Sequence, residues 1–322
     1  MTSQTRLAPI QTFTPPSGRT FSYCTYGAAD GDPVLAFHGT PGSRLKYAIA
    51  DQVARQLNLR LLSIDRWGYG ATPPPPRAEW SVRGFGEDMQ HLLDDHGLGK
   101  TSVVGISGGG PYALGTTAVL NGRVSKLALV APVAPLVGDN ANQAANGEMT
   151  VFHRVAFFGV PRVPGLVRGT FGALRHVLNI NGPAAMRLIT ARASSADRRI
   201  ACEPSNAQRL AETFRVGLSQ TTQGAVIDMN VFSNAWDVDL KTIDTKTRLW
   251  IGSEDRNVPL KPATALAQRV ANLEVIELRG AGHFWISQHY ADVLHWLAGD
   301  DAQPSTEPKS VSVQAAARNP NN

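Results

Sequence analysis

A serine between glycines is the residue whose setting best supports chemistry in this 322-residue chain. Residues 103–110 read Val-Val-Gly-Ile-Ser-Gly-Gly-Gly, a Gly-x-Ser-x-Gly pattern centred on Ser107. The pattern stands where a short apolar run, residues 102–106, leads directly into a predicted helix. Gly105 and Gly109 leave room for the tight turn that such a junction requires. The turn would present the Ser107 hydroxyl as a nucleophile at the carboxyl end of a sheet.

This nucleophile needs two partners, because a serine hydroxyl is unreactive near neutral pH. A neutral imidazole must take its proton, and a buried carboxylate must hold that imidazole in the right tautomer. Asp255 and His283 each follow a predicted late strand, residues 248–252 and 273–278. Carboxyl ends of parallel strands meet at one edge of a sheet, so we expect Asp255 and His283 beside Ser107.

Other carboxylates stay open for the role of the acid. Glu254 adjoins Asp255 in the sequence, and three more candidates, Asp228, Asp237 and Asp239, precede the late strands.

No metal or cofactor site is predicted. The chain contains no His-Glu-x-x-His pattern, and its cysteines, Cys24 and Cys202, lack metal-ligand spacing to a second thiol. Residues 99–101 match the end of a phosphate-binding loop, but they precede the predicted strand at residues 102–106, whereas such a loop follows its strand. Residues 108–113 copy a dinucleotide fingerprint, but the next strand ends without the acidic residue that would hold a ribose.

The elements that must position these residues alternate between strand and helix, which predicts an α/β sheet. Residues 20–25 alternate polar and apolar as an edge strand does, and the runs 33–38 and 59–65 are typical of buried parallel strands. A helix capped by Ser81 is expected to end at Gly97 or Gly99. Further strands are predicted at residues 102–106, 124–133, 248–252 and 273–278, and further helices at residues 43–58, 112–120, 262–271 and 284–298.

The alternation stops at residues 137–235, which predict an inserted block of helices. Apolar residues recur there at helical spacing in stretches 152–160, 166–177, 184–193 and 207–216. The insert would divide one sheet domain into residues 1–136 and 236–299. Residues 300–322 are rich in Pro, Ser, Gln and Asn and are expected to be a disordered tail.

With these motifs the chain resembles the serine-type α/β-hydrolase superfamily over about residues 13–298, apart from the insert. The matching stretches are His38-Gly39-Thr40-Pro41-Gly42, Asp65-Arg66-Trp67-Gly68-Tyr69-Gly70, the serine motif, Gly252-Ser253-Glu254-Asp255 with Val258-Pro259, and Gly280-Ala281-Gly282-His283. The resemblance implies an α/β-hydrolase fold, a mostly parallel twisted sheet flanked by helices, with the insert as a helical cap. The superfamily's chain order of nucleophile, acid and base matches Ser107, Asp255 and His283.

The resemblance also implies an oxyanion hole built from the backbone N–H groups of Thr40 and Gly108. In the same motifs His38, Gly39, Gly105 and Gly109 would be structural, with His38 bonded to the backbone. Gly108 departs from the Met or Trp that follows the nucleophile in several subfamilies.

The expected function is a metal-free serine hydrolase that cleaves a carboxylic ester, or a related lactone, amide or carbamate, through an acyl-enzyme. Members of the superfamily use the same triad as aminopeptidases, carbon–carbon bond hydrolases, acyltransferases and cofactor-free haloperoxidases. A non-catalytic ligand-binding member is the alternative of a different class.

Charge and composition restrict the classes of partner that we expect for this chain. The formal charge is +5, and the insert carries +4 of it through ten arginines against six acidic residues. Because no basic run forms a stripe, nucleic acid is not expected as a partner. Without a signal-peptide core or an apolar run of about 18 residues, the chain is expected to be cytoplasmic and not membrane-bound.

The expected partner is a small-molecule substrate with an acyl group. Seven apolar residues of the insert either line its pocket or pack the insert: Phe152, Phe157, Phe158, Val160, Phe171, Leu174 and Met186. Inward-facing arginines would favour an anionic substrate, whereas outward-facing ones would simply be solvated.

Overall fold

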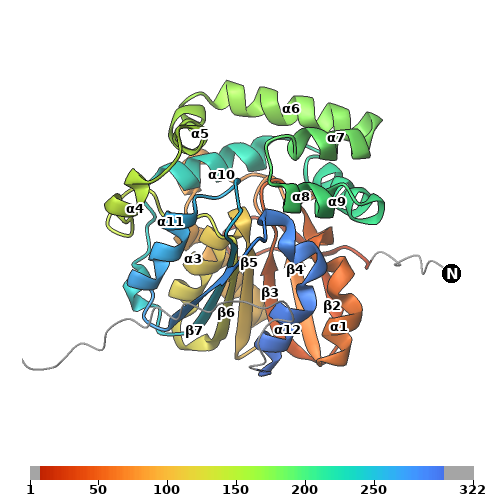
Figure 1. The fold of residues 1–322 in the computed structure, drawn as a ribbon. Helices are drawn as coiled ribbons and strands as arrows, with labels where there is room; N and C mark the ends of the chain where they lie inside the picture. Colours follow the sequence, from red (N-terminus) through yellow and green to blue (C-terminus); the bar gives the residue numbers. More distant parts are fainter. Residues whose placement is uncertain (1–7, 301–322) are drawn as a thin grey trace, which may run out of the picture.

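An eight-stranded sheet runs through the centre of the protein in a computed structural model that describes residues 8–300 (Figure 1). The predicted tail lies outside the described residues from residue 301 onward. The spatial order of the strands is β1-β2-β4-β3-β5-β6-β7-β8. The pairs β1·β2 and β2·β4 are antiparallel and all others are parallel. The strands are β1 (Gln11–Phe13), β2 (Phe21–Gly27), β3 (Asp32–Phe37), β4 (Leu59–Ile64), β5 (Thr101–Ile106), β6 (Val124–Val130), β7 (Lys246–Gly252) and β8 (Leu273–Leu278).

The central strands are mainly apolar because both faces of the sheet are covered. In β3, Leu35 and Phe37 pack into the cluster that includes α2 (Val82–Asp95) and α3 (Gly110–Leu120). Val34 and Ala36 point the other way, into the cluster of α1 (Asp51–Gln56) and α12 (Tyr290–Ala298). The sheet is thus the middle layer of three (Figure 1).

The prediction of an edge strand at residues 20–25 was wrong in its position. That strand is β2, which lies between β1 and β4, and only Thr25 within it is partly exposed. The edge is β1, a strand of three residues, too short to show a periodic pattern.

Several predicted elements end earlier or divide. The strand predicted to reach residue 133 stops at Val130, because Ala131 takes a positive φ of 45° before Pro132. The helix predicted at 43–58 is a 3₁₀ helix η1 (Arg44–Ala50) followed by the short α1. The last predicted helix begins as a 3₁₀ turn at His283–Gln288 before α12, and α11 (Leu260–Thr264) continues as a 3₁₀ turn at Ala265–Gln268. The Ser81 cap is present, with Oγ accepting the Gly84 N–H at 2.9 Å.

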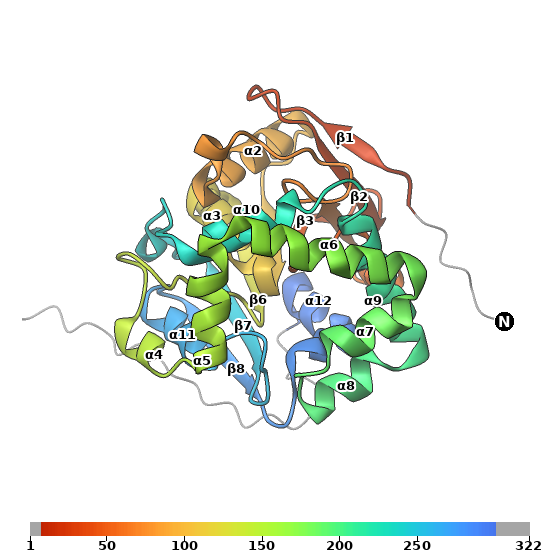
Figure 2. The same cartoon turned by 90° about the horizontal axis from the view of Figure 1, so that it is seen from above.

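The chain between β6 and β7 is mainly helical. Figures 1 and 2 show that α6 to α9 lie across one end of the sheet. They are α4 (Gln143–Gly147), α5 (Val151–Arg154), α6 (Pro164–Ile180), α7 (Gly182–Ile189), α8 (Ser195–Ala201), α9 (Pro204–Gly217) and α10 (Gln223–Ser233). The four predicted apolar stretches fall in α5 to α7 and α9, whereas α4, α8 and α10 had no counterpart in the periodicity. α10 packs into the main core through Ile227, Val231 and Phe232.

Nine of the ten arginines in this region are exposed, and Arg175 is partly buried. Across residues 8–300, no helix combines the length and the apolar character needed to cross a lipid bilayer.

Candidate active site

Ser107 occupies a sharp turn between β5 and the helical segment that becomes α3. Its φ is +54°, a left-handed conformation that is costly for a residue with a side chain. The neighbouring glycines allow the turn: a Cβ on Gly105 would lie 2.6 Å from the Ala113 Cβ, and one on Gly109 would lie 2.5 Å from the Phe37 carbonyl oxygen. The strained turn therefore holds the Ser107 side chain clear of the strand.

Ser107, His283 and Asp255 form a continuous chain of hydrogen bonds. His283 Nε2 lies 3.0 Å from Ser107 Oγ, and His283 Nδ1 lies 2.7 Å from Asp255 Oδ2. Because a carboxylate only accepts, Nδ1 carries the proton and Nε2 is free to accept one from the serine. The other oxygen of Asp255 accepts the backbone N–H groups of Asn257 and Val258, at 2.8 and 3.0 Å. The carboxylate is thereby fixed from its own loop.

The charges around His283 favour a role as a general base. Burial alone would lower the pKa of His283, but the charge of Asp255 and its hydrogen bond raise it above its ordinary value of 6.5. Asp197 adds to the rise and Lys46 opposes it.

The other candidate carboxylates do not contact His283. Glu254 is exposed, Asp237 accepts the Arg83 N–H at 3.1 Å, and Asp239 accepts the Lys241 N–H at 3.0 Å. Asp228 is buried in a separate cluster with Arg66. Of the candidates weighed from the sequence, Asp255 is the one that the fold brings to the histidine.

The loop His38–Gly42 lies directly against the serine turn. A Cβ on Gly39 would be 3.1 Å from Ser107 Cβ, and one on Gly108 would be 2.1 Å from Thr40 Oγ1. The Thr40 N–H donates no hydrogen bond to another described residue, and Gly108 lies in the first turn of a helix, where N–H groups lack intrahelical partners. The two predicted oxyanion donors therefore come from adjacent segments.

His38 holds that loop through the backbone. Its Nδ1 lies 2.8 Å from the Gly39 carbonyl oxygen, and its Nε2 accepts the Arg66 N–H at 3.2 Å. Burial and the charge of Arg66 lower the pKa of His38 well below its ordinary value. A neutral imidazole with its proton on Nδ1 satisfies both bonds.

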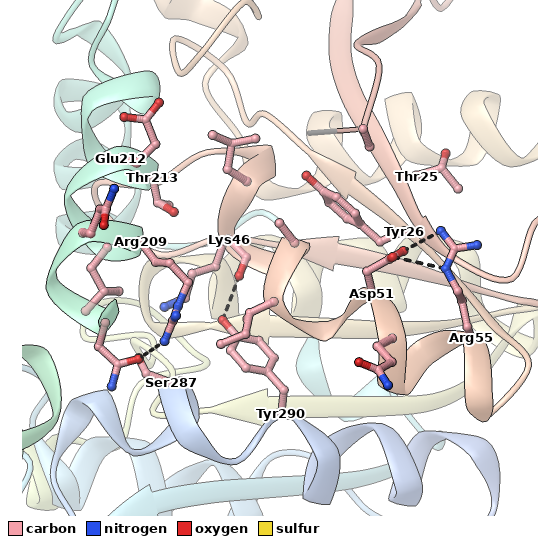
Figure 3. A pocket seen from close by; sticks show the side chains of 18 of the residues that line it. Thr25, Tyr26, Lys46, Asp51, Arg55, Arg209, Glu212, Thr213, Ser287 and Tyr290 are labelled. Atoms are coloured by element: carbon pink, nitrogen blue, oxygen red, sulfur yellow. Dashed lines mark hydrogen bonds and ion pairs between the residues drawn. The ribbon is translucent and has the colours of Figure 1, made fainter. Parts of the chain in front are cut away.

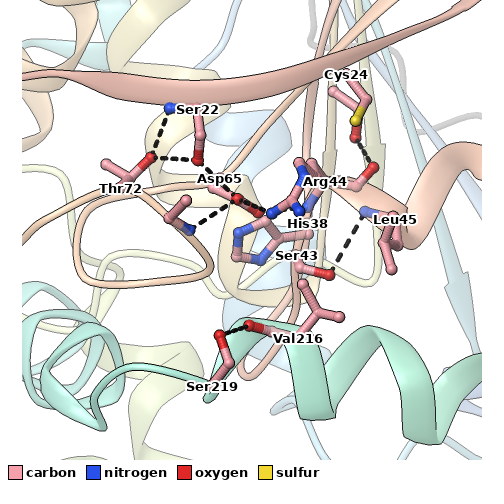
Figure 4. A network of polar contacts seen from close by, with 12 residues as sticks. Ser22, Cys24, His38, Ser43, Arg44, Leu45, Asp65, Thr72, Val216 and Ser219 are labelled. Atoms are coloured by element: carbon pink, nitrogen blue, oxygen red, sulfur yellow. Dashed lines mark hydrogen bonds and ion pairs between the residues drawn. The ribbon is translucent and has the colours of Figure 1, made fainter. Parts of the chain in front are cut away.

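A buried carboxylate, Asp65, fixes the segment that follows the loop (Figure 4). Asp65 accepts the Arg44 N–H at 2.6 Å, the Arg44 guanidinium at 2.5 Å and the Ser22 hydroxyl at 2.8 Å. Next to it, the Ser43 hydroxyl donates to the Thr213 carbonyl of α9 at 2.9 Å. These bonds join the loop both to the sheet and to a helix of the region between β6 and β7.

A second buried carboxylate, Asp228 of α10, accepts hydrogen bonds from four side chains in three segments. It forms an ion pair with Arg66, and both side chains are fully buried. The Tyr69 hydroxyl donates to Oδ2 at 2.7 Å, the Tyr112 hydroxyl donates to Oδ1 at 2.8 Å, and the Thr40 hydroxyl donates to Oδ2. Asp228 therefore ties Thr40 to the turn after β4 and to the helix that follows Ser107.

A third carboxylate, Asp197 of α8, meets the loop of His283. Its Oδ1 accepts the Phe284 N–H at 2.7 Å, whereas its buried Oδ2 has no hydrogen-bond partner among residues 8–300. A Cβ on Gly282 would lie 2.4 Å from the Asp197 carboxyl group. Glycine at position 282 thus allows this close approach.

The space beside Gly108 is apolar on one side. A Cβ on Gly108 would lie 2.8 Å from the Phe232 ring, which packs 6.2 Å from the ring of Phe157. Of the aromatic candidates from the sequence, Phe157 is buried, whereas Phe152 is 43% exposed and lies under the Arg192 guanidinium. Met186 packs in the cluster between α7 and α9, which does not include Phe157 or Phe232.

Residues 8–300 contain no group of three or more His, Cys, Asp or Glu side chains arranged to hold a metal ion.

Reasoning from the sequence missed Asp197 and the partners of Asp228. Asp197 has no motif around it, and its one signal was Gly282, a glycine directly before the histidine. Arg66 and Tyr69 stood in a matched motif, but nothing in the sequence showed that a carboxylate 162 residues away from Arg66 would join them.

Comparisons with known proteins agree with this architecture. A sequence model described as "Alpha/beta hydrolase family" matches residues 34–296. The chain is 24% identical over 281 residues to 2-hydroxymuconate semialdehyde hydrolase of Pseudomonas putida, covering 85% of this chain and 89% of that protein. Among solved structures, an alpha/beta hydrolase fold protein from Nakamurella multipartita superposes with a TM-score of 0.64 at 24% identity, covering 90% of this chain and 100% of that one. An esterase from Exiguobacterium antarcticum superposes with a TM-score of 0.64 at 18% identity, covering 89% and 98%. On the match over residues 34–296, this chain belongs to the alpha/beta hydrolase family.

Proposed function

We propose that the protein is a serine hydrolase that cleaves a carboxylic ester, or a related lactone, amide or carbamate, through an acyl-enzyme. The observation that carries the proposal is the hydrogen-bonded chain from Asp255 through His283 to Ser107, at 2.7 and 3.0 Å. No other described carboxylate takes the place of Asp255 at His283 Nδ1.

In the first half of the reaction, Ser107 Oγ attacks the acyl carbon while His283 Nε2 takes the hydroxyl proton. The N–H groups of Thr40 and Gly108 would stabilise the negative oxygen of the tetrahedral intermediate. His283 then returns the proton to the leaving alcohol or amine as the bond to it breaks, which leaves the acyl group on Ser107.

In the second half, water attacks the acyl-enzyme and His283 takes its proton. Collapse of the second intermediate releases the carboxylic acid and restores the Ser107 hydroxyl. Asp255 keeps its charge throughout and stabilises the imidazolium formed at each step.

The helices between β6 and β7 are proposed to act as a cap over this site. Asp197 of α8 and Asp228 of α10 both bond to segments next to the triad, so these helices shape the surroundings of Ser107. Phe232 and Phe157 supply an apolar wall, which favours a hydrocarbon group on the substrate.

Cleavage of a carbon–carbon bond is the second candidate, because a relative of similar length is named 2-hydroxymuconate semialdehyde hydrolase. That chemistry would use the same three residues on a different substrate. A panel of ester, lactone and amide substrates together with 2-hydroxymuconate semialdehyde separates the two.

The direct test compares the wild type with Ser107→Ala on nitrophenyl esters of short acids. We expect the variant to lose at least about 10⁴-fold in turnover, because the nucleophile acts as one unit with its base. In parallel, a fluorophosphonate probe should add to the wild type and not to Ser107→Ala by intact-protein mass. An unlabelled wild type would favour the ligand-binding alternative, and a fully active variant would overturn the assignment of Ser107.

A further inference from the structure

A cavity of about 1000 Å³ opens between α9 and the segment that follows the oxyanion loop (Figure 3). Its walls come from α9, from η1 and α1, from β2 and from the start of α12. Ser107, Asp255 and His283 do not line it. The cavity is therefore distinct from the reacting centre, although Ser287 in its wall follows His283 by four residues.

Two cations in the wall form no ion pair with a carboxylate among residues 8–300. Lys46 is partly buried, and within residues 8–300 it forms no ion pair. Arg209 is exposed, and its hydrogen bond goes to the neutral Asn206 side chain. Its charge acts on Glu203, but Glu203 does not line the cavity. The cavity thus presents two positive charges that its own wall does not neutralise.

The acidic residues of the wall already form ion pairs with other cations. Asp51 binds Arg55 at 3.0 Å, and Glu212 binds Arg215 at 2.6 Å. The first pair lies within α1 and the second within α9. Neither carboxylate forms an ion pair with Lys46 or Arg209.

A buried hydroxyl also lacks a partner. Ser287 is 7% exposed, and its Oγ makes no hydrogen bond with another described residue. Buried polar groups nearly always find a partner, so an acceptor supplied from outside the chain would satisfy it. Figure 3 shows Ser287 on the same side of the cavity as Arg209.

Part of the wall is apolar. Ile49 is 40% exposed on η1, and Leu45, Ala48 and Leu210 lie with it along the cavity. An occupant with a charged head and a hydrocarbon tail would match both parts of the wall. Arginine suits a planar carboxylate because its fork of N–H groups donates two parallel hydrogen bonds.

We propose that this cavity binds an aliphatic monocarboxylate, with its head between Lys46, Arg209 and Ser287 and its tail along Ile49 and Leu210.

The charge state of Lys46 is compatible with this site. Burial lowers the pKa of Lys46 to about 8, so the side chain remains mostly protonated at pH 7. A bound carboxylate would stabilise the protonated form further.

A carboxylate bound in this cavity would also change the pKa of His283. Beside the larger effects of burial and of Asp255, the charge of Lys46 lowers the pKa of His283. A carboxylate that offsets this charge would raise the pKa of His283, and the acid limb of the rate profile would move to higher pH. This consequence rests on the proposed function, whereas binding itself does not.

Calorimetric titration of the full chain with octanoate, and with 1-octanol as the uncharged control, tests the binding at pH 7. We expect octanoate to bind at least tenfold more tightly than octanol. Octanol binding as tightly, or no heat from octanoate at millimolar concentration, would overturn the proposal.

Variants then locate the site. The double variant Lys46→Met/Arg209→Gln should weaken octanoate binding at least tenfold, whereas Lys261→Met, an exposed lysine on α11, should leave it unchanged. Ile49→Glu places a carboxylate on an already exposed position, so it should fold and also weaken binding. Undiminished affinity in folded double and Ile49→Glu variants would mean that octanoate binds elsewhere, the acyl site included, and would overturn the proposal.

The rate profile is a separate measurement. Saturating octanoate should move the acid limb of kcat/KM for ester hydrolysis upward in the wild type and not in the double variant. If the protein hydrolyses no ester and takes no fluorophosphonate label, the proposed function fails while the calorimetric result still stands.

Discussion

The carboxylate of Asp197 accepts a hydrogen bond from the backbone N–H of Phe284 at 2.7 Å, which fastens α8 to the loop that bears His283. The two residues are 87 positions apart in the sequence. Through this contact a helix between β6 and β7 influences both the position and the charge of the proposed base.

Replacing Asp197 by Asn should shift the pH dependence of activity. Burial lowers and Asp255 raises the pKa of His283, and the Asp197 charge adds to the rise. The wild type should therefore lose kcat/KM as the pH falls through a value above 6.5, because only neutral His283 accepts the serine proton. Asn keeps an acceptor for Phe284 but removes the charge, so the acid limb should move to lower pH.

The matched control for this change is Asp139→Asn, an exposed acid in the same region of the chain. Its profile should overlay that of the wild type. An acid limb of Asp197→Asn that stays in place or rises would show that the Asp197 charge does not act on His283.

Replacing Asp255 by Asn should nearly abolish ester hydrolysis. Asn can donate toward His283 Nδ1 and so favour the wrong tautomer, an effect worth about 10⁴ in kcat in serine proteases. Glu254→Gln, at the exposed neighbouring position, should retain most of the activity. Steady-state kinetics of the two variants decide between the carboxylates, and the reverse ranking would move the acid to Glu254.

Replacing Gly108 by Ala should disturb the proposed oxyanion hole. The added Cβ would lie 2.1 Å from Thr40 Oγ1, so the loop that carries the Thr40 N–H must shift. Loss of one such donor reduces kcat about 10²- to 10³-fold. The measurement is kcat on a short nitrophenyl ester, compared with Gly122→Ala, where a Cβ meets no atom within 4 Å.

A second substitution separates this mechanism from general misfolding. In the double variant Gly108→Ala/Thr40→Ala the clash with Oγ1 is removed, so part of the kcat should return. A double variant no faster than Gly108→Ala alone would argue against displacement of Thr40 as the cause.

Replacing Asp228 by Ala should destabilise the fold more than the loss of any surface ion pair. The change leaves the buried Arg66 guanidinium without its counter-charge, which typically lowers the free energy of unfolding by about 3–5 kcal/mol. The comparison is Asp94→Ala, which breaks a solvent-exposed pair with Arg123 and should cost less than about 1 kcal/mol. Urea unfolding of both variants measures the difference, and equal losses would contradict a structural role for the cluster.

Much of the proposed catalytic arrangement could be predicted because it is encoded locally. Gly105, Ser107 and Gly109 lie within five residues, and the strand before them and the helix after them have clear apolar patterns. Asp255 and His283 each follow an apolar strand of a parallel sheet, so their approach to Ser107 follows from the geometry of strand ends. The main layers of the fold were predictable for the same reason.

What could not be predicted depends on contacts between distant segments. β1 is too short to show a period, and its pairing with β2 moved the edge of the sheet. The helix predicted at residues 43–58 divides into η1 and α1, and bonds from Ser43 and Arg44 hold its start to distant segments, which no local preference encodes.

The sequence by itself determined the proposed nucleophile, its two proposed partners and the parallel sheet that brings them together, because turn chemistry and strand periodicity act over a few residues. Only the tertiary structure decided that Asp197 meets the histidine loop, that Asp228 binds Thr40 and Arg66, and that Lys46, Arg209 and Ser287 share one cavity. Those contacts depend on how the helices between β6 and β7 pack on the sheet, and packing is a property of the whole chain rather than of any window along it.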